Sequence, residues 1–368
     1  MKKIFTLVSF FITLHIGAQE TLSSIKIILK DSSNNVISIK KHSNWNAVFS
    51  DSSLAGKEFD AVIIDSLGRT IKPILQNKII RSISKDAHNE KVLYAGIKGA
   101  NSGDAKVMKS EDFGNSWVFL NGGNPLSEKA EDVQEIVASP YTNKLIFAGT
   151  WKHGLYKSTD AGKTFEKVVN FPSSDVRSII FHPKNDQEIL VATIPHGIVK
   201  SSDGGNSWEI QNYQEDPFKI VWKMEQSPYD AHEIYALCIR QGLHKTTDFG
   251  STWKKVAEGE NAVFYGLGWL NKNVLYCSTI DGQSGNIFMS NDGGDTFTEI
   301  ENPEKDIISD FLKIDKTLYA SGQKNLYIIK NNKVKNTNYL LPFPTISHLL
   351  EVKGKLLIAT WGNGIRIL

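Results

Sequence analysis

The amino-acid sequence predicts an all-β fold in which one four-stranded unit is repeated around a closed ring. Two observations support this prediction. A short polar turn pattern recurs five times at a nearly constant interval, and a pair of short apolar runs recurs seven times along the chain. No helical periodicity is sustained over a dozen residues, and the runs are separated by Gly, Asn and Asp, which is typical of β-strands joined by turns. A repeat of this length indicates a propeller or a solenoid.

The turn pattern reads Ser/Thr-x-Asp-x-Gly-x-Ser/Thr-Trp/Phe. Successive aspartates are 48, 43, 45 and 44 residues apart. The Asp carboxylate can accept hydrogen bonds from N–H groups of its own turn, and the Gly supplies a positive φ. The aromatic residue begins the next strand and can bury a large ring. The pattern therefore predicts five structural turns, at 110–117, 158–165, 201–208, 246–253 and 290–297.

This pattern resembles the Asp-box, also called the bacterial neuraminidase repeat. The Asp-box occurs in sialidases, xyloglucan-cleaving hydrolases, sortilin-type receptors and photosystem II assembly factors, all of which are β-propellers. The resemblance covers five short turns. It implies a propeller, and it implies that the boxes lie on the face away from the usual ligand site.

The apolar runs give the number of blades. Each predicted inner strand is followed within about ten residues by a second β-rich run. The inner runs are 80–83, 133–136, 176–179, 221–224, 264–267, 308–311 and 346–349. We therefore predict a single seven-bladed β-propeller with Asp-box turns, with eight blades as the alternative.

Three segments are predicted along the chain. Residues 1–19 have the form of an export signal, with Lys2 and Lys3 before an apolar core and a small-residue cleavage region. Residues 20–58 form an extra β segment at the rim or a degenerate eighth blade. Residues 59–368 form the propeller, whose last blade is incomplete, and we expect the run 62–71 to supply its missing outer strand and close the ring.

The composition limits the partners. The chain has 42 basic and 40 acidic side chains, two of the basic ones in the predicted signal, so it has no electrostatic footprint for nucleic acid. No later apolar stretch approaches the length of a transmembrane helix. Cys238 and Cys277 are expected to be buried free thiols, and no zinc-type spacing occurs. We predict a periplasmic or secreted protein with no cofactor and no metal. We also predict a monomer, because a closed ring needs no partner to fold.

Candidate site residues lie in two sets at one end of the predicted ring. The first set is in the loops between second and third strands, where His153, His196, Gln241 and Asn363 precede a glycine and Trp151, Lys152, Arg240 and Trp361 are close by. The second set is a column at the start of the inner strands: Arg81, Gln134, Arg177, Trp222, Tyr265, Ser309 and Ser347. The next column holds Ser82, Glu135, Ser178, Lys223, Gly266, Asp310 and His348.

These residue types favour carbohydrate. Trp and Tyr can stack on pyranose rings, and Arg or Lys can pair with a uronate carboxylate. Elimination next to a uronate needs a cation to neutralise the carboxylate and a base to take the α-proton. We predict an enzyme of this lyase or dehydratase type acting on acidic oligo- or polysaccharides, with catalytic His153, His196, Tyr265 and Arg177. The predicted substrate-binding residues are Trp151, Lys152, Trp222, Lys223, Arg240, Gln241, Arg81, Trp361 and Asn363.

Other functions stay open. The first alternative is a non-catalytic propeller that binds a glycan or a protein. A glycoside hydrolase would need two carboxylates across the cleft, for which Asp310, Glu135 and Asp281 are available. A sialidase is disfavoured because no Arg-Ile-Pro motif occurs. An assembly factor that holds its client on a basic patch is disfavoured by the neutral charge balance.

Overall fold

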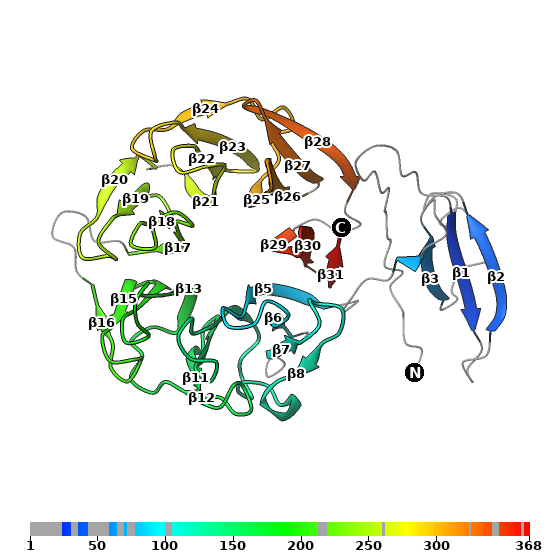
Figure 1. The fold of residues 1–368 in the computed structure, drawn as a ribbon, viewed down its shortest axis with the longest axis horizontal. Helices are drawn as coiled ribbons and strands as arrows, with labels where there is room; N and C mark the ends of the chain where they lie inside the picture. Colours follow the sequence, from blue (N-terminus) through cyan, green and yellow to red (C-terminus); the bar gives the residue numbers. More distant parts are fainter. Residues whose placement is uncertain are drawn as a thin grey trace.

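The structure is a computed structural model of the chain. It describes residues 24–30, 36–42, 59–64, 70–71, 78–99, 105–211, 219–259, 262–323, 325–340, 346–361 and 364–368. Seven antiparallel sheets follow one another around a ring (Figure 1). The described residues contain no α-helix, and no helix among them is long and apolar enough to cross a membrane. The predicted all-β, seven-bladed propeller is therefore confirmed.

Each blade is a sheet of consecutive strands. The first four blades are β5–β8 (Ile79–Lys85, Leu93–Lys98, Lys106–Ser110, Val118–Phe119), β9–β12 (Val133–Ala138, Ile146–Thr150, Gly154–Ser158, Glu166–Lys167), β13–β16 (Asp175–Phe181, Ile189–Ile194, Gly197–Ser201, Glu209–Ile210) and β17–β20 (Val221–Gln226, Ile234–Cys238, Leu243–Thr246, Lys254–Ala257). The last three are β21–β24 (Val263–Trp269, Leu275–Asp281, Ser284–Ser290, Thr298–Ile300), β25–β28 (Ile308–Ile314, Thr317–Gly322, Asn325–Lys330, Lys333–Leu340) and β29–β31 (Ile346–Val352, Lys355–Thr360, Ile365–Ile367).

The core lies between the faces of neighbouring blades. Residues of β14 and β18 pack in one apolar cluster, and residues of β18 and β22 pack in the next. Because the second strand of a blade is covered on both faces, its sequence is a continuous apolar run and not an alternating one. The two predicted thiols belong to this core, since Cys238 and Cys277 are both buried and neither forms a disulfide.

The five polar turns have one common structure. In the turn 201–208, the N–H of Gly205 donates to Ser201 Oγ at 2.8 Å, and Asp203 accepts from the N–H of Ser207 at 2.8 Å and from its hydroxyl at 2.7 Å. Equivalent bonds recur around Asp112, Asp160, Asp248 and Asp292. Gly205 has φ of 81°, as the pattern predicts.

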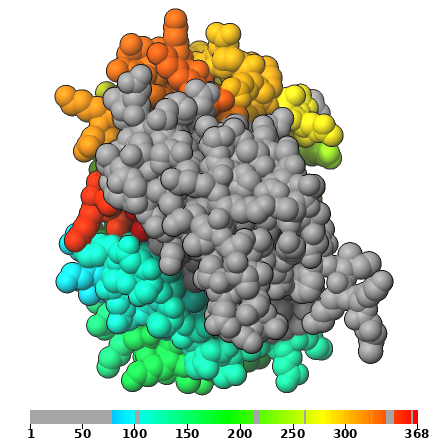
Figure 2. All heavy atoms as spheres, turned by 90° about the vertical axis from the view of Figure 1, so that its right-hand side faces the viewer, coloured from blue at the N-terminus to red at the C-terminus, as the bar shows by residue number. Residues whose placement is uncertain are grey.

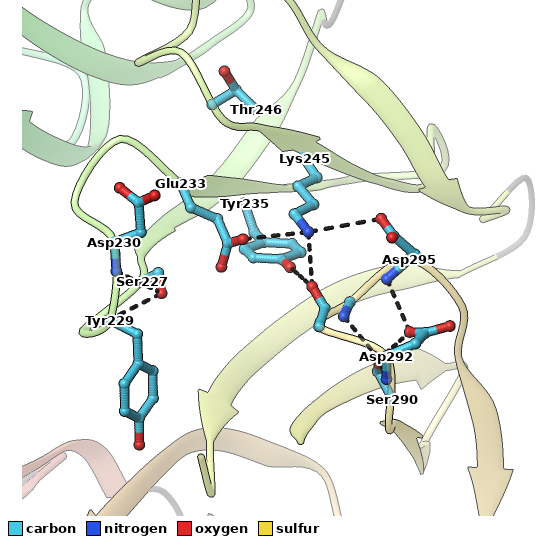
Figure 3. A network of polar contacts seen from close by, with 12 residues as sticks. Ser227, Tyr229, Asp230, Glu233, Tyr235, Lys245, Thr246, Ser290, Asp292 and Asp295 are labelled. Carbon is cyan, nitrogen blue, oxygen red and sulfur yellow. Dashed lines mark hydrogen bonds and ion pairs between the residues drawn. The ribbon is translucent and has the colours of Figure 1, made fainter. Parts of the chain in front are cut away.

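These turns also join blades. Figure 3 shows Lys245 on β19 reaching the turn of the next blade, where its ammonium donates to Gly293 O at 2.7 Å. The hydroxyl of Tyr235 donates to the same carbonyl at 2.9 Å. Glu233 and Asp295 lie 3.2 Å and 3.7 Å from the Lys245 ammonium. A largely buried lysine, with a side chain 12% exposed, thus fixes the turn of one blade to the sheet of another.

The ring closes between the last blade and the first. Ser347 Oγ on β29 donates to Ile80 O at 2.5 Å, and the Lys85 ammonium lies 2.7 Å from Glu351. An apolar cluster that includes Leu93 and Leu357 lies between the two sheets. Figure 2 shows the C-terminal strands (red) between the first blade (cyan) and the sixth (orange). Face-to-face packing and side-chain contacts therefore hold the ring together at this point.

The N-terminal strands pair differently from the sequence prediction. β3 (Phe59–Ile64) pairs with β1 (Ser24–Lys30) and β4 (Thr70–Ile71) in a separate sheet, of order β2-β1-β3-β4, in which β2 is Val36–His42. The expected outer strand 62–71 therefore has its described residues in this sheet and not beside β31. Every residue of β3 pairs with β1, so this edge of β3 has its backbone hydrogen-bonding partners already. β3 is then not available in this way to add an outer strand to the last blade. The predicted signal, residues 1–19, lies outside the described residues.

Candidate functional site

A cavity of about 310 Å³ opens at the centre of the ring, at the end where the inner strands begin. All seven inner strands contribute to it, through the whole column predicted from the sequence: Arg81, Gln134, Arg177, Trp222, Tyr265, Ser309 and Ser347. Glu135, Lys223 and His348 from the next column also line it, together with Lys98, Trp151, Ile346 and Trp361. The volume is at the lower end of the range of about 300–1,000 Å³ that is usual for ligand pockets.

A β-bulge in every blade explains this convergence. In β17, Val221 pairs with Cys238 and Lys223 pairs with Leu237, which leaves Trp222 as an extra residue. The same one-residue slip occurs at Gln134 and at each other member of the column. A bulge redirects a side chain and breaks the strict alternation of a strand. Consecutive residues of one strand can therefore both face the channel.

Two arginines in the cavity wall are held by carboxylates. Nε and Nη2 of Arg81 both lie 2.8 Å from Oδ2 of Asp132, which is fully buried. Arg177 Nη2 lies 2.9 Å from Asp175, and its Nη1 donates to Gln134 at 3.3 Å. Burial raises the pKa of both carboxyls and the guanidiniums oppose this change. Both arginines are thus fixed in position, and the charge of each guanidinium is balanced by a carboxylate.

The aromatic side chains at the mouth are fixed by the same arginines. The Arg81 guanidinium lies 3.9 Å from the ring centroid of Trp361, and that of Arg177 lies 4.6 Å from Trp222. Trp222 stacks on Tyr265, with centroids 5.4 Å apart and planes inclined by 23°. Trp361 remains 38% exposed. The mouth therefore offers aromatic surface that is ordered before any ligand arrives.

A charged cluster lies below this aromatic layer. The Lys223 ammonium lies 2.5 Å from Glu225 and 3.5 Å from Asp310. Glu135 forms no ion pair with a described residue, and burial raises its pKa to about 8. Burial, with Lys223 nearby, lowers the pKa of His348 to about 4, and its Nδ1 is buried with no hydrogen-bond partner among the described residues. At neutral pH the cavity floor therefore presents an uncharged carboxyl and an uncharged imidazole.

The structure brings together only part of the predicted site. Seven of the predicted residues line the cavity: Arg81, Trp151, Arg177, Trp222, Lys223, Tyr265 and Trp361. The described lining does not include His153, His196, Lys152, Arg240 or Gln241, which lie in the turns between second and third strands. Gln241 instead accepts hydrogen bonds from the N–H groups of Lys219 and Ile220. Asn363 lies outside the described residues.

Some residues of the site were not predicted as binding residues. Gln134, Glu135, Ser309, Ser347 and His348 were in the two columns, but nothing in the sequence distinguished them from braces between blades. Lys98, at the end of β6, was missed entirely. Its position corresponds to that of Trp151, because Lys98 pairs with Ile79, just before Ile80, and the N–H of Trp151 donates to O of Asp132, just before the equivalent Val133. Alignment of the second-strand ends could have found it.

The described residues contain no group of three or more His, Cys, Asp and Glu side chains placed to hold a metal ion. A second hollow, of about 630 Å³, lies beside β20–β23 and is lined by Phe264, Phe288 and Phe297 with Asp281 and Asn286 at its polar side. Asp281 thus lies away from the channel mouth.

Similarity to known proteins extends over most of the chain in fold but over only a short part of it in sequence. No protein-family model matches the chain. A curated xyloglucanase from Hypocrea jecorina is 30% identical over 105 residues, which is 26% of this chain and 12% of the xyloglucanase. The match thus spans about an eighth of that relative.

Three solved structures resemble the whole propeller. An ancestral GH74 enzyme has a TM-score of 0.61 at 17% identity, covering 81% of this chain and 47% of its own. YCF48 bound to D1 peptide has a TM-score of 0.57 at 14% identity, covering 80% and 94%. The extracellular domain of a putative one-component system from B. thetaiotaomicron has a TM-score of 0.62 at 13% identity, covering 81% and 39%. The chain spans about half the length of the GH74 structure and nearly all of YCF48, and it shares the propeller fold of all three.

Proposed function

We propose that the channel mouth is a carbohydrate-binding site and that the protein recognises a glycan without cleaving it. The observation that carries this proposal is the fixed aromatic surface. Trp361 is held by Arg81, and Trp222 is held by Arg177 and by stacking on Tyr265. The cavity around them is lined mostly by hydrogen-bonding side chains. Preordered aromatic rings beside amides, hydroxyls and guanidiniums suit a ligand with both apolar faces and many hydroxyls.

Hydrolysis has weaker support. Glycosidases normally use two carboxyl groups on opposite sides of the scissile bond. Glu135 is the one carboxyl among the described lining residues. Glu225 and Asp310 are engaged by Lys223, and Asp310 also accepts from the N–H groups of Phe311 and Leu349. No second carboxylate is left free to act as nucleophile or base in the described cavity.

The predicted elimination lacks both a suitable base and an unpaired arginine in the described cavity. His153 and His196, the predicted bases, are outside the described lining of the cavity. Tyr265 lies in it, but burial raises the pKa of its hydroxyl, so the group stays protonated at neutral pH and does not supply the base. Arg177, predicted to neutralise a uronate, is already paired with Asp175. The geometry therefore favours binding over lyase chemistry.

The names of the relatives agree with a carbohydrate role, since a xyloglucanase and a GH74 enzyme are among them. One of the similar structures is an extracellular domain. We propose in addition that residues 1–19 direct export, so that the protein meets glycans in the periplasm or outside the cell.

A panel of oligosaccharides tests the proposal. Isothermal titration with xyloglucan, cellulose, galactan and pectin fragments is expected to give binding that Trp361→Ala weakens about tenfold. Tyr229→Ala serves as the control, because it removes another exposed aromatic ring that is not part of the cavity. Tyr229 follows the end of β17, whereas the cavity residue Trp222 is near the start of that strand. Mass spectrometry of the recovered ligand is expected to find no cleavage. Shortened or unsaturated products would contradict a binding role, and the absence of binding to every glycan would contradict the carbohydrate assignment.

A peptide ligand is the second candidate. The chain matches nearly the full length of YCF48, whose structure was solved with a bound peptide, whereas it matches about half of the GH74 structure. The same aromatic mouth could receive an extended protein segment. Screening a random-peptide display library against wild type and Trp361→Ala tests this candidate. Enrichment that depends on Trp361, without any glycan binding, would favour the peptide.

A further inference from the structure

The charges around the cavity are matched within the protein itself. Arg81 is paired with Asp132, Arg177 with Asp175, and Lys223 with Glu225 and Asp310. The fourth lining cation, Lys98, lies near Asp132 and adds to the attraction on that carboxylate. Four cations therefore face four carboxylates, and Glu135 is the carboxyl left over. A charged ligand group that approached Arg81, Arg177 or Lys223 would have to break one of these pairs, which leaves a poorly solvated charge behind.

Glu135 faces this cluster from β9. The charged and titratable groups around it are Lys223 and Glu225 on β17, Asp310 on β25 and His348 on β29, with Tyr265, Arg177 and Arg81 higher in the wall. The single ammonium in the cluster is already shared by two carboxylates. An ionised Glu135 would add a fifth negative charge with no cation to pair it, so the carboxyl is held in its protonated form.

We propose that the cavity takes an uncharged, hydroxyl-rich sugar and that the protonated carboxyl of Glu135 donates a hydrogen bond to it. This inference rests on the proposed function and specifies the ligand class of the same site. His348 Nδ1, buried and without a partner among the described residues, is the neighbouring group that a sugar hydroxyl can satisfy. Uronate-containing glycans, which the sequence analysis favoured, are then the poorer ligands.

The proposal predicts a pH dependence with a definite sign. Glu135 is a donor below its pKa of about 8 and an acceptor above it. Burial alone would lower the pKa of Lys223, but the neighbouring carboxylates of Asp310 and Glu225 outweigh it and raise that pKa, so the residue stays charged over the same range. Affinity should therefore be level near neutral pH and fall as Glu135 ionises. In Glu135→Gln the amide donates at every pH, and the alkaline fall should disappear.

Matched sugar pairs test the inference. Titration calorimetry would compare glucose with glucuronate oligomers and galactose with galacturonate oligomers, using the purified protein at about pH 6.5 and about pH 9.5. The neutral member of a pair is expected to bind better, and its affinity is expected to fall about tenfold at the higher pH in wild type and to change little in Glu135→Gln. Glu166→Gln, on the exposed strand β12, is the control and should follow wild type.

The outcomes separate this inference from the proposed function. Preference for the uronate members, or an alkaline fall of the same size in Glu135→Gln, would overturn the inference while leaving carbohydrate binding in place. Failure of every saccharide to bind at either pH would overturn the proposed function and this inference with it.

Discussion

Arg81 and Trp361 come from the first and the last blade, and the guanidinium carbon of Arg81 lies 3.9 Å from the ring centroid of Trp361. The two residues are neighbours only because the ring closes, and Ile79, two residues before Arg81, forms a β-bridge with Trp361. The same contact therefore belongs both to ring closure and to the wall of the binding cavity.

Removing the tryptophan ring should affect binding more than folding. Trp361→Ala deletes an exposed ring that contacts Arg81, and an exposed cation–π contact is worth about 0.5–1 kcal/mol. We expect the free energy of unfolding to fall by no more than this, while ligand affinity falls about tenfold. Calorimetric binding and chemical denaturation of one preparation separate the two effects. A large loss of stability with unchanged affinity would assign Trp361 to ring closure alone.

The buried Arg81–Asp132 pair should be costly to break. Asp132→Asn removes the charge that holds the guanidinium, and breaking a buried pair from one side typically costs about 3–5 kcal/mol. Urea denaturation at neutral pH measures the change. Glu111→Gln breaks the exposed Lys109–Glu111 pair, which at 2.7 Å is about as short as the 2.8 Å Arg81–Asp132 pair, and should cost less than about 1 kcal/mol. Equal effects of the two variants would show that Asp132 is not important for fixing Arg81.

The contact between blades at Lys245 allows a similar comparison. Lys245→Met removes a charged hydrogen bond to Gly293 O and leaves Glu233 without its cation, so unfolding should become easier by about 2 kcal/mol (Figure 3). Lys254, 71% exposed and 4.0 Å from the same Asp295, is the control. Lys254→Met is expected to change stability by less than about 0.5 kcal/mol. Thermal and chemical unfolding of both variants would check this.

The polar turns should make the propeller sensitive to acid. Hydrogen bonds from Thr164 and Ser207 hold the pKa of Asp160 and of Asp203 at about 2, and the turn around Thr296 lowers the pKa of Asp292 as well. An unfolded Asp titrates near 3.9. The depressed pKa means that these carboxylates stabilise the fold above about pH 4 and lose that contribution as pH falls toward about 2.

Asp-to-Asn variants test this acid sensitivity. The triple variant Asp160→Asn, Asp203→Asn, Asp292→Asn is expected to be less stable than wild type at neutral pH and to show a flatter stability profile between about pH 4 and about pH 2. Equilibrium denaturation across that range measures both quantities. A profile that stays parallel to that of wild type would mean that other carboxyls control acid unfolding.

Glu135 should have the opposite dependence on pH. Its pKa is about 8 in the folded protein and near 4.3 when unfolded, so the folded state binds one more proton between these values. Stability should therefore decrease as pH rises from about 4.3 to about 8 and level off above. Glu135→Gln removes this decrease, and its advantage over wild type should grow across that window. A constant difference between the two proteins would show that Glu135 is already ionised in the fold.

The sequence predicted the fold well because its strongest signals are local. Each of the five polar turns is stabilised by hydrogen bonds within the turn itself, so a short stretch of sequence is enough to predict it. The continuous apolar runs predict second strands that are covered on both faces. The column of residues from Arg81 to Ser347 could also be predicted. In a closed ring of similar repeats, the same position of each inner strand lies at the same height around the central channel. The pairing of the N-terminal strands could not be predicted, because β1 and the edge of the last blade are both possible partners for the run 62–71.

The sequence by itself determined an all-β ring of seven blades, the positions of the turns and the column of side chains at the channel mouth, because each follows from a pattern within one repeat. Only the tertiary structure decided what that column does. The bulges that aim it inward, the carboxylates that neutralise Arg81 and Arg177, and the exclusion of His153 and His196 from the described cavity lining depend on distances between blades. Those distances arise from packing of residues far apart in the chain, which no single repeat encodes.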